Sequence, residues 1–163
     1  MLTVLISDDE PDVCQLIIHL IEWGKKNLKL AGIASNGIEC LEKIKACRPD
    51  IVITDIRMPG LNGLDLVREA GEAGIMPHFI IISGYQEFKY AQQAIRYGVA
   101  DYLLKPIGKR ELGRCLDRII HKIYADQAEA SVFRQKEDLY QKNRRQMEKH
   151  LIAVLRHQPE SCQ

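Results

Sequence analysis

Five short apolar segments alternate with five segments of helical periodicity, and this alternation limits the possible folds more than any other feature of the chain. The apolar segments are rich in β-branched residues, and we predict strands at Leu2–Ile6, Leu28–Ala34, Ile51–Thr54, His78–Ser83 and Ala100–Leu104. Parallel strands need a long crossover connection, usually a helix, and that crossover is almost always right-handed. The pattern therefore predicts an α/β fold, in which helices cover both faces of a parallel sheet.

The helical segments carry apolar residues three and four positions apart, together with start and stop signals. We expect the first helix to begin at Pro11, after acidic residues, and to close at Gly24. The second should follow a cap at Ser35 or Asn36 and end before Pro49. Three further helices are expected at Leu64–Ala70, at Phe88–Ile95 and from Lys109 onward.

Composition bounds the size and the class of the protein. A chain of 163 residues that is 46% hydrophobic and 28% charged can form one ordinary core with an appendage. Its net charge of +1 gives no electrostatic reason to expect nucleic acid or an anionic membrane as a direct partner. The 5 cysteines form no Cys-x-x-Cys pair, and no signal peptide or membrane span is visible, so we expect reduced thiols in a cytoplasmic protein.

Polar side chains follow four of the predicted strands directly. Asp8 and Asp9 come after the first strand, Asp55 after the third, Ser83 at the end of the fourth and Lys105 after the fifth. The carboxyl ends of parallel strands meet at one edge of the sheet, where ligands bind in folds of this class. Carboxylates crowded there would raise each other's pKa unless a cation lies among them.

This set of residues suits phosphoryl chemistry. Mg²⁺ prefers carboxylate oxygens and shares phosphate oxygens, while a lysine ammonium and a serine hydroxyl can hold the rest of a phosphoryl group. The carboxylate of Asp55 can attack phosphorus to form an aspartyl phosphate. We expect Asp9 to hold the metal, with help from Asp8 and the backbone carbonyl of Arg57, beside Asp55.

Four short motifs occur in a fixed order: "DD" after the first strand, "DIRMPGLNG" around Asp55, "SGY" after the fourth strand and "DYLLKP" across the fifth. Together they make the sequence resemble a receiver domain of a two-component response regulator, over roughly Leu2 to Tyr124. The resemblance implies a flavodoxin-like, doubly wound sheet of five parallel strands in the order 2-1-3-4-5. It also implies phosphoryl transfer from a separate sensor histidine kinase, since no histidine of this chain has a recognisable catalytic partner.

The resemblance assigns roles to individual residues. Asp55 corresponds to the phosphoacceptor, Asp8 and Asp9 to the metal-binding acids, and Ser83 and Lys105 to the residues that sense the phosphate. Ser83 also acts in the switch with Tyr102, the aromatic residue that turns inward on activation. Arg57 and Tyr85 occupy the variable positions that tune the lifetime of the phosphoryl group. The expected output face consists of the helix Phe88–Ile95, the strand Ala100–Leu104 and the helix from Lys109, and it can also form a homodimer.

The stretch "SGYQEFKYAQQAIRYGVADYLLKP" further resembles the receivers that precede AraC-type (arabinose-regulator-like) DNA-binding domains. This implies control of transcription, with DNA contacted only through such an effector domain. An effector of that type needs about 100 further residues with two helix-turn-helix units, which this chain does not carry. We therefore expect either a fragment of a longer protein or a different output.

The C-terminal part of the sequence predicts a long helix. Neither Gly nor Pro occurs from Arg114 to Gln158, so a helix could run to Pro159 and reach on the order of 65 Å. Its apolar residues follow a heptad spacing, but Asp126, Glu137 and Arg144 fall on the same positions, which makes a marginal two-stranded coil a hypothesis. The expected organisation is a receiver at 1–124, a helical linker or coil at 125–158 and a flexible end at 159–163.

Simpler explanations exist for each residue taken alone. The paired acids could cap a helix, Asp55 and Ser83 could be turn residues, and Lys105 could be an ordinary solvated lysine. Two rival functions also remain open. A phosphatase of the haloacid-dehalogenase type would want an aspartate where Arg57 stands, and a stand-alone phosphorelay carrier would need no effector domain. We expect a phosphoacceptor switch that can slowly lose its phosphoryl group, and not a conventional enzyme.

Overall fold

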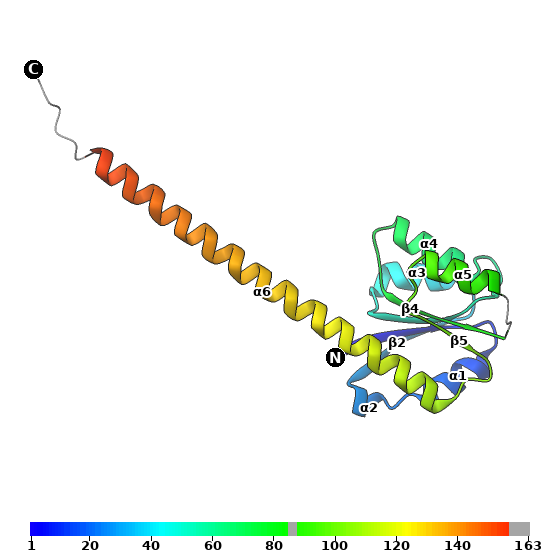
Figure 1. Ribbon diagram of the computed structural model, residues 1–163. Coiled ribbons are helices and arrows are strands. Elements are labelled where there is room, and N and C mark those ends of the chain that lie inside the picture. The colour runs from blue at the N-terminus through cyan, green and yellow to red at the C-terminus, as the bar shows by residue number, and fades with distance from the viewer. Residues whose placement is uncertain (85–87, 157–163) are drawn as a thin grey trace, which may run out of the picture. The chain divides into compact units, whose positions relative to one another are not determined.

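The computed structural model describes residues 1–84 and 88–156. Its centre is a five-stranded parallel sheet in the order β2-β1-β3-β4-β5 (Figure 1). The strands are β1 (Leu2–Ser7), β2 (Leu28–Ala34), β3 (Ile51–Asp55), β4 (His78–Ser83) and β5 (Asp101–Leu104). The α/β class and the strand order predicted from the sequence are confirmed.

The middle of the sheet is closed to solvent, which is why its strands are nearly continuous apolar runs. All residues of β3 are buried, and β3 pairs in register with β4, with Ile51 beside His78 and Ile53 beside Ile80. Burying one isoleucine side chain stabilises the fold by about 1.5–3 kcal/mol. The buried pairing of β3 with β4 therefore holds the two strand ends that carry Asp55 and Ser83 in fixed positions.

Helices cover both faces of the sheet (Figure 1). They are α1 (Pro11–Leu20), α2 (Trp23–Lys26), α3 (Gly37–Cys47), α4 (Gly63–Glu72), α5 (Phe88–Arg96) and α6 (Lys109–Arg156). One core layer joins α3, α4 and α5 to Leu5, Val52 and Phe79 of the sheet. On the other face Cys14 and Ile17 of α1 are buried, as are Leu112 and Leu116 in the first turns of α6.

The start of α1 at Pro11 is as expected, but its expected closure at Gly24 is wrong. The helix ends at Leu20, and Gly24 lies inside the short helix α2. The Trp23 indole donates a hydrogen bond to the carbonyl oxygen of Ile18 at 2.8 Å, which holds this extra turn against the end of α1. Asn27 then closes α2 in the left-handed conformation, with φ of 53°.

The caps of α3 and α4 are asparagines. The Asn36 side chain accepts a hydrogen bond from the backbone N–H of Glu39, and the Asn62 side chain accepts from those of Leu64 and Asp65. Of the two candidates for the cap of α3, Asn36 therefore fills the position. Each such cap contributes about 1 kcal/mol by satisfying a helix N–H that has no partner within the helix.

Two units make up the chain, Met1–Ile119 and Ile120–Gln163. The first contains the whole sheet. The second contains the remainder of α6, on which every residue from 124 to 156 is exposed. We call the helical residues 120–156 the extension; the domain boundary proposed at 124 stays a prediction. None of the helices in residues 1–84 and 88–156 combines the length and the hydrophobicity that a membrane span needs.

Candidate functional site

The carboxyl ends of the strands bring Asp8, Asp55, Ser83 and Lys105 to one edge of the sheet. The ammonium of Lys105 lies 3.2 Å from a carboxylate oxygen of Asp8 and 3.2 Å from one of Asp55. The backbone N–H of Lys105 donates to the carbonyl oxygen of Ser83 at 2.8 Å, which ties the fifth strand end to the fourth. The peptide bond between Lys105 and Pro106 is cis.

Asp8, Asp55 and Ser83 are buried: Asp8 is 2% exposed, Asp55 7% and Ser83 fully covered. Burial raises the pKa of Asp55 above its ordinary value, and the charge of Asp8 adds to the rise, while Lys105 and the backbone N–H of Ile56 oppose it. A carboxylate with a raised pKa and little exposure holds a charge that water does not stabilise. Such groups occur most often at functional sites.

Lys105 supplies the positive charge of the site. Burial lowers the pKa of its ammonium, but Asp55 and Asp8 outweigh this effect, so the pKa is raised overall. Lys105 therefore stays protonated between the two carboxylates. Glu10 completes its surroundings, with a carboxylate oxygen 4.0 Å from the ammonium.

The acids after β1 form a group that fits a hard metal ion. The carboxylates of Asp8, Asp9 and Glu10 lie within 4.8 Å of one another, with Asp8 buried and the other two exposed. A carboxylate oxygen of Asp8 accepts from the backbone N–H of Glu10 at 2.9 Å, which fixes its orientation. Oxygen donors of this kind, partly open to water, are the ligands that Mg²⁺ takes in proteins. Glu10 is absent from the ligands predicted from the sequence, because acids before Pro11 also suit a helix start.

A cleft of about 370 Å³ opens beside these acids. Its lining consists of Asp9, Ile56, Arg57, Met58, Pro59, Asn62 and Tyr90. The guanidinium of Arg57 lies 5.9 Å from the centroid of the Tyr90 ring, within the range of a cation–π contact. The cleft brings Arg57 and Asp9 to one opening.

Gly63 supports the end of β3 in a way that sequence reasoning missed. A Cβ atom at this position would lie 2.5 Å from the carbonyl oxygen of Asp55. The N–H of Gly63 donates to the carbonyl oxygen of Ile56 at 2.8 Å. The first turn of α4 thus rests directly on the backbone that carries Asp55, and only glycine fits there. The sequence signal for this contact is the pair Asn62-Gly63, which by local pattern alone indicates only a turn.

Tyr102 on β5 is half-buried and packs against the core layer of α3, α4 and α5. Its N–H donates to the side chain of Asp101 at 2.8 Å, and Arg118 of α6 forms an ion pair with the same carboxylate. Tyr102 thus belongs to the α5, β5 and α6 side of the first unit, where the output face is expected. Tyr85, the second predicted lifetime residue, lies outside the described residues. The roles of all these side chains stay predictions.

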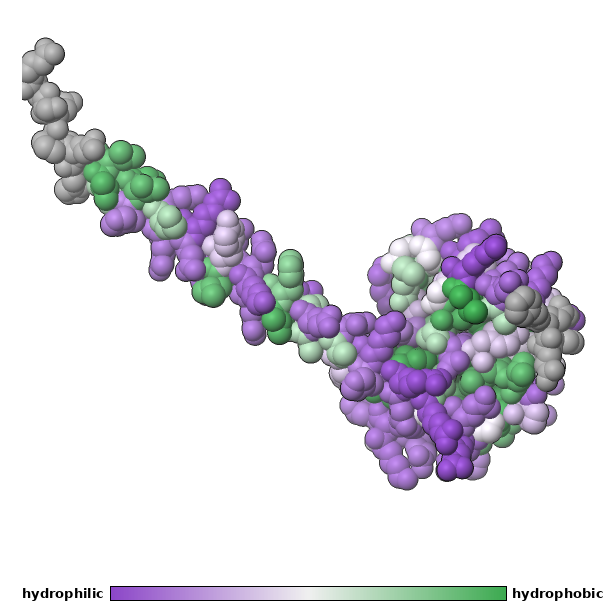
Figure 2. All heavy atoms as spheres, in the orientation of Figure 1, coloured by the Kyte–Doolittle hydropathy of each residue, from purple (hydrophilic) through white to green (hydrophobic). Residues whose placement is uncertain are grey.

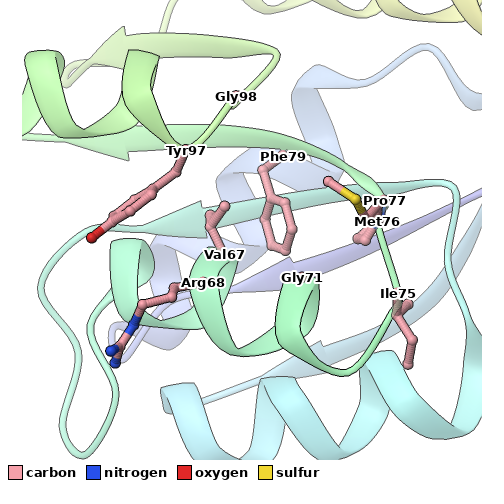
Figure 3. A pocket seen from close by; sticks show the side chains of 9 residues that line it. All are labelled: Val67, Arg68, Gly71, Ile75, Met76, Pro77, Phe79, Tyr97 and Gly98. Atoms are coloured by element: carbon pink, nitrogen blue, oxygen red, sulfur yellow. The ribbon is translucent and has the colours of Figure 1, made fainter.

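A second cavity, of about 140 Å³, lies at the opposite end of β4, between α4 and the end of α5. Figure 3 shows Val67 and Phe79 side by side in it, with the guanidinium of Arg68 turned away. Arg68 forms ion pairs with Asp65 and Glu69 at 3.6 and 3.5 Å. This mainly apolar pocket holds none of the predicted site residues.

Comparison with known proteins identifies a protein family and relatives with similar sequences. Residues 4–117 match the response regulator receiver domain. The chain is 40% identical over 123 residues to YesN, an uncharacterized transcriptional regulatory protein of Bacillus subtilis, covering 76% of this chain and 33% of YesN. It is 36% identical over 129 residues to the transcriptional regulatory protein HptR of Staphylococcus aureus, covering 79% of this chain and 50% of HptR. The chain therefore spans half or less of the length of these relatives.

Solved structures show the same fold. The receiver domain of AraT, a response regulator from Geobacillus stearothermophilus, has 38% identity and a TM-score of 0.72, and the match covers 77% of this chain and 98% of that one. The signal receiver domain of NarL from Mycobacterium tuberculosis has 26% identity and a TM-score of 0.68, covering 74% of this chain and 96% of that one.

Proposed function

Because this chain belongs to the response regulator receiver domain family, whose members are signalling domains, we propose that Asp55 accepts a phosphoryl group from a sensor histidine kinase. The observation that carries the proposal is the position of Lys105, 3.2 Å from carboxylate oxygens of both Asp8 and Asp55. A fixed cation beside a buried carboxylate can hold the oxygens of a phosphoryl group as it arrives.

The chemistry follows from the residues at this edge. A carboxylate oxygen of Asp55 attacks phosphorus, the bond from phosphorus to the kinase histidine breaks, and an aspartyl phosphate forms while the histidine takes up a proton. The charge of Lys105 opposes the rise in pKa that burial causes at Asp55, which favours the ionised form that acts as the nucleophile. Ser83, buried at the end of β4, provides a hydroxyl for the phosphoryl oxygens.

Asp8, Asp9 and Asp55, with the backbone carbonyl of Arg57, are the residues that would hold Mg²⁺, and the group of Asp8, Asp9 and Glu10 supports this choice. When bound, Mg²⁺ offsets negative charge on the transferring group. The bond between Asp8 and the N–H of Glu10 orients the acids before any ion arrives.

We further propose that the phosphoryl group shifts a population between two packings of Ser83 and Tyr102. The α5, β5 and α6 side of the first unit then changes its partners or forms a homodimer. The names of YesN and HptR favour a transcriptional output over a stand-alone phosphorelay carrier. An AraC-type domain is the effector that we propose. Arg57, beside Asp9 in the cleft, and Tyr85 would set how slowly the aspartyl phosphate hydrolyses.

The test is the intact mass of the protein after incubation with acetyl phosphate and Mg²⁺. We expect a gain of one phosphoryl group in the wild type and none in Asp55→Ala. Asp65→Asn, which changes a partly exposed carboxylate on α4, is the matched control and should gain the group like the wild type. A chelator in place of Mg²⁺ should suppress the gain. Equal gain in wild type and Asp55→Ala, or no gain in a folded wild type, would overturn the proposal.

A further inference from the structure

The extension carries a stripe of residues at heptad spacing that faces solvent. We call this stripe the seam. It consists of eight positions: Ala130, Phe133, Glu137, Tyr140, Arg144, Met147, Leu151 and Val154. Phe133 is 68% exposed, Tyr140 66% and Met147 67%. Figure 2 shows apolar side chains recurring between polar ones along the extension and gathering toward its end. An apolar surface patch formed by Ala128, Glu129, Val132, Phe133 and Lys136 lies on the same helix.

We infer that the extension pairs with the extension of a second copy of this chain in the antiparallel direction. Apolar residues alternating three and four positions apart are typical of helices that pair through such a stripe. The charges within and beside the seam decide the direction. This inference does not depend on phosphoryl transfer.

A parallel pair would place like charges against each other. In a parallel two-stranded coil each seam residue faces the same residue of the partner. Glu137 would then face the partner's Glu137, and Arg144 the partner's Arg144. Asp126, four residues before Ala130 in the same heptad register, would face the partner's Asp126 in the same way. Like charges held a few ångströms apart between helices repel, so each of these layers opposes the parallel arrangement.

An antiparallel pair removes all of these contacts. When residue 142 lies at the two-fold axis, each seam residue faces the one whose number adds with its own to 284. Leu151 then faces the partner's Phe133, and Val154 faces the partner's Ala130. Arg144 faces the ring of the partner's Tyr140, which favours a guanidinium stacked on an aromatic face. Glu137 faces the partner's Met147 and lies one turn from the partner's Arg144, an opposite charge.

The flanking positions agree with this direction. In the antiparallel register Arg134 comes beside the partner's Glu148, and the symmetry repeats the pair. The parallel arrangement also offers a favourable pair, Glu129 with the partner's Arg134, so flanking charges alone do not distinguish the parallel from the antiparallel arrangement. The charges within the seam, Glu137 and Arg144, favour the antiparallel one. The antiparallel overlap runs from 128 to 156, about four heptads, and leaves Asp126 outside it.

The experiment is disulfide formation between differently tagged copies of the full chain. Cys47, which is exposed, and Cys162 are first replaced by serine, which leaves the buried Cys14, Cys40 and Cys115. One copy then carries Phe133→Cys and the other Leu151→Cys. We expect cross-links between the two kinds of copy, because positions 133 and 151 face each other. Two copies of Leu151→Cys should not cross-link, because their cysteines lie roughly 27 Å apart along the antiparallel pair.

The parent protein, in which Cys47 and Cys162 are replaced by serine, is also studied by sedimentation across a concentration series. We expect it to show a monomer–dimer equilibrium. Where Phe133→Cys or Leu151→Cys abolishes that dimer, Ala130→Cys and Val154→Cys replace them, since these positions also face each other. Cross-links only between identical variants would show a parallel pair and overturn the inference. A parent that stays monomeric at the highest concentration, or dimeric without mixed cross-links from either pair, would overturn it as well.

Discussion

Ile80 and Ile152 are the same residue type in the two units of this chain, but Ile80 is fully buried in β4 and Ile152 is 52% exposed on α6. In the first unit, strands and helices form because each covers the apolar face of another. In the extension every side chain from 124 to 156 is exposed, so helix propensity and local pairs alone hold the helix in a single chain. Helical spacing in a sequence therefore indicates a helix without indicating what the helix packs against.

The largest expected effect is on the free energy of unfolding, when Ile80 in the first unit and Ile152 on the extension are each truncated to alanine. Ile80→Ala should lower the free energy of unfolding by about 2–5 kcal/mol, because it leaves a cavity in a closed core. Ile152→Ala, outside the seam, should change it by less than about 0.5 kcal/mol. Urea denaturation of both variants measures the difference. Similar losses in both would mean that the extension is covered in solution at this position, and the comparison between the units would fail.

The next effect concerns close packing in the first unit. Gly63→Ala should cost about 1–3 kcal/mol, because its Cβ would press on the backbone of Asp55, and it should also slow phosphorylation. Gly71→Ala, later in the same helix, meets no atom within 4 Å. It should stabilise the protein by about 0.5–1 kcal/mol, since alanine favours a helix over glycine. A Gly63→Ala variant as stable as the wild type would show that α4 can move away from β3.

A pH-dependent effect distinguishes the buried charge of the first unit from the solvated charges of the extension. The folded chain binds the Asp55 proton more tightly than the unfolded chain, since burial raises its pKa, so ionisation destabilises the fold. Asp55→Asn should therefore be more stable than the wild type at neutral pH. The advantage should shrink as pH falls through the folded pKa and vanish below the ordinary carboxyl pKa.

Thermal unfolding from acid to neutral pH measures this advantage, with Asp138→Asn, which changes an exposed carboxylate of the extension, as the control variant. An Asp55→Asn variant less stable than the wild type at neutral pH would mean that the ion pair with Lys105 outweighs burial.

The smallest expected effect lies on the extension. Arg144 and Glu148 form an ion pair at 3.3 Å with both side chains exposed. Glu148→Gln should weaken the helix of the monomer by about 0.3–0.5 kcal/mol, and salt should remove the difference. Circular dichroism of dilute protein at low and high salt measures it. A much larger loss that depends on protein concentration would instead report the pair with the partner's Arg134.

The sheet and the meeting of Asp8, Asp55 and Lys105 at its edge followed from the sequence, because apolar runs ended by polar residues are strong local signals. Asp55 is predictable from the run Ile51–Thr54 and the turn residues after it. Helix α2 was missed because four residues have no periodicity, and its stability depends on a contact between Trp23 and the end of α1. The close approach of Gly63 to Asp55 was missed because it depends on how α4 packs, which no local pattern encodes.

The strand order has a consequence for how the chain is made. β1 lies between β2 and β3, and Thr3 donates its backbone N–H to the carboxylate of Asp50, 47 residues later. The ribosome synthesises β1 well before β3, so the edge of β1 that pairs with β3 has no hydrogen-bonding partner during that time. During translation the apolar strand β1 should therefore stay exposed, with an unpaired edge, until about residue 55 has emerged from the ribosome. A chaperone that binds nascent chains would find its binding site on this strand.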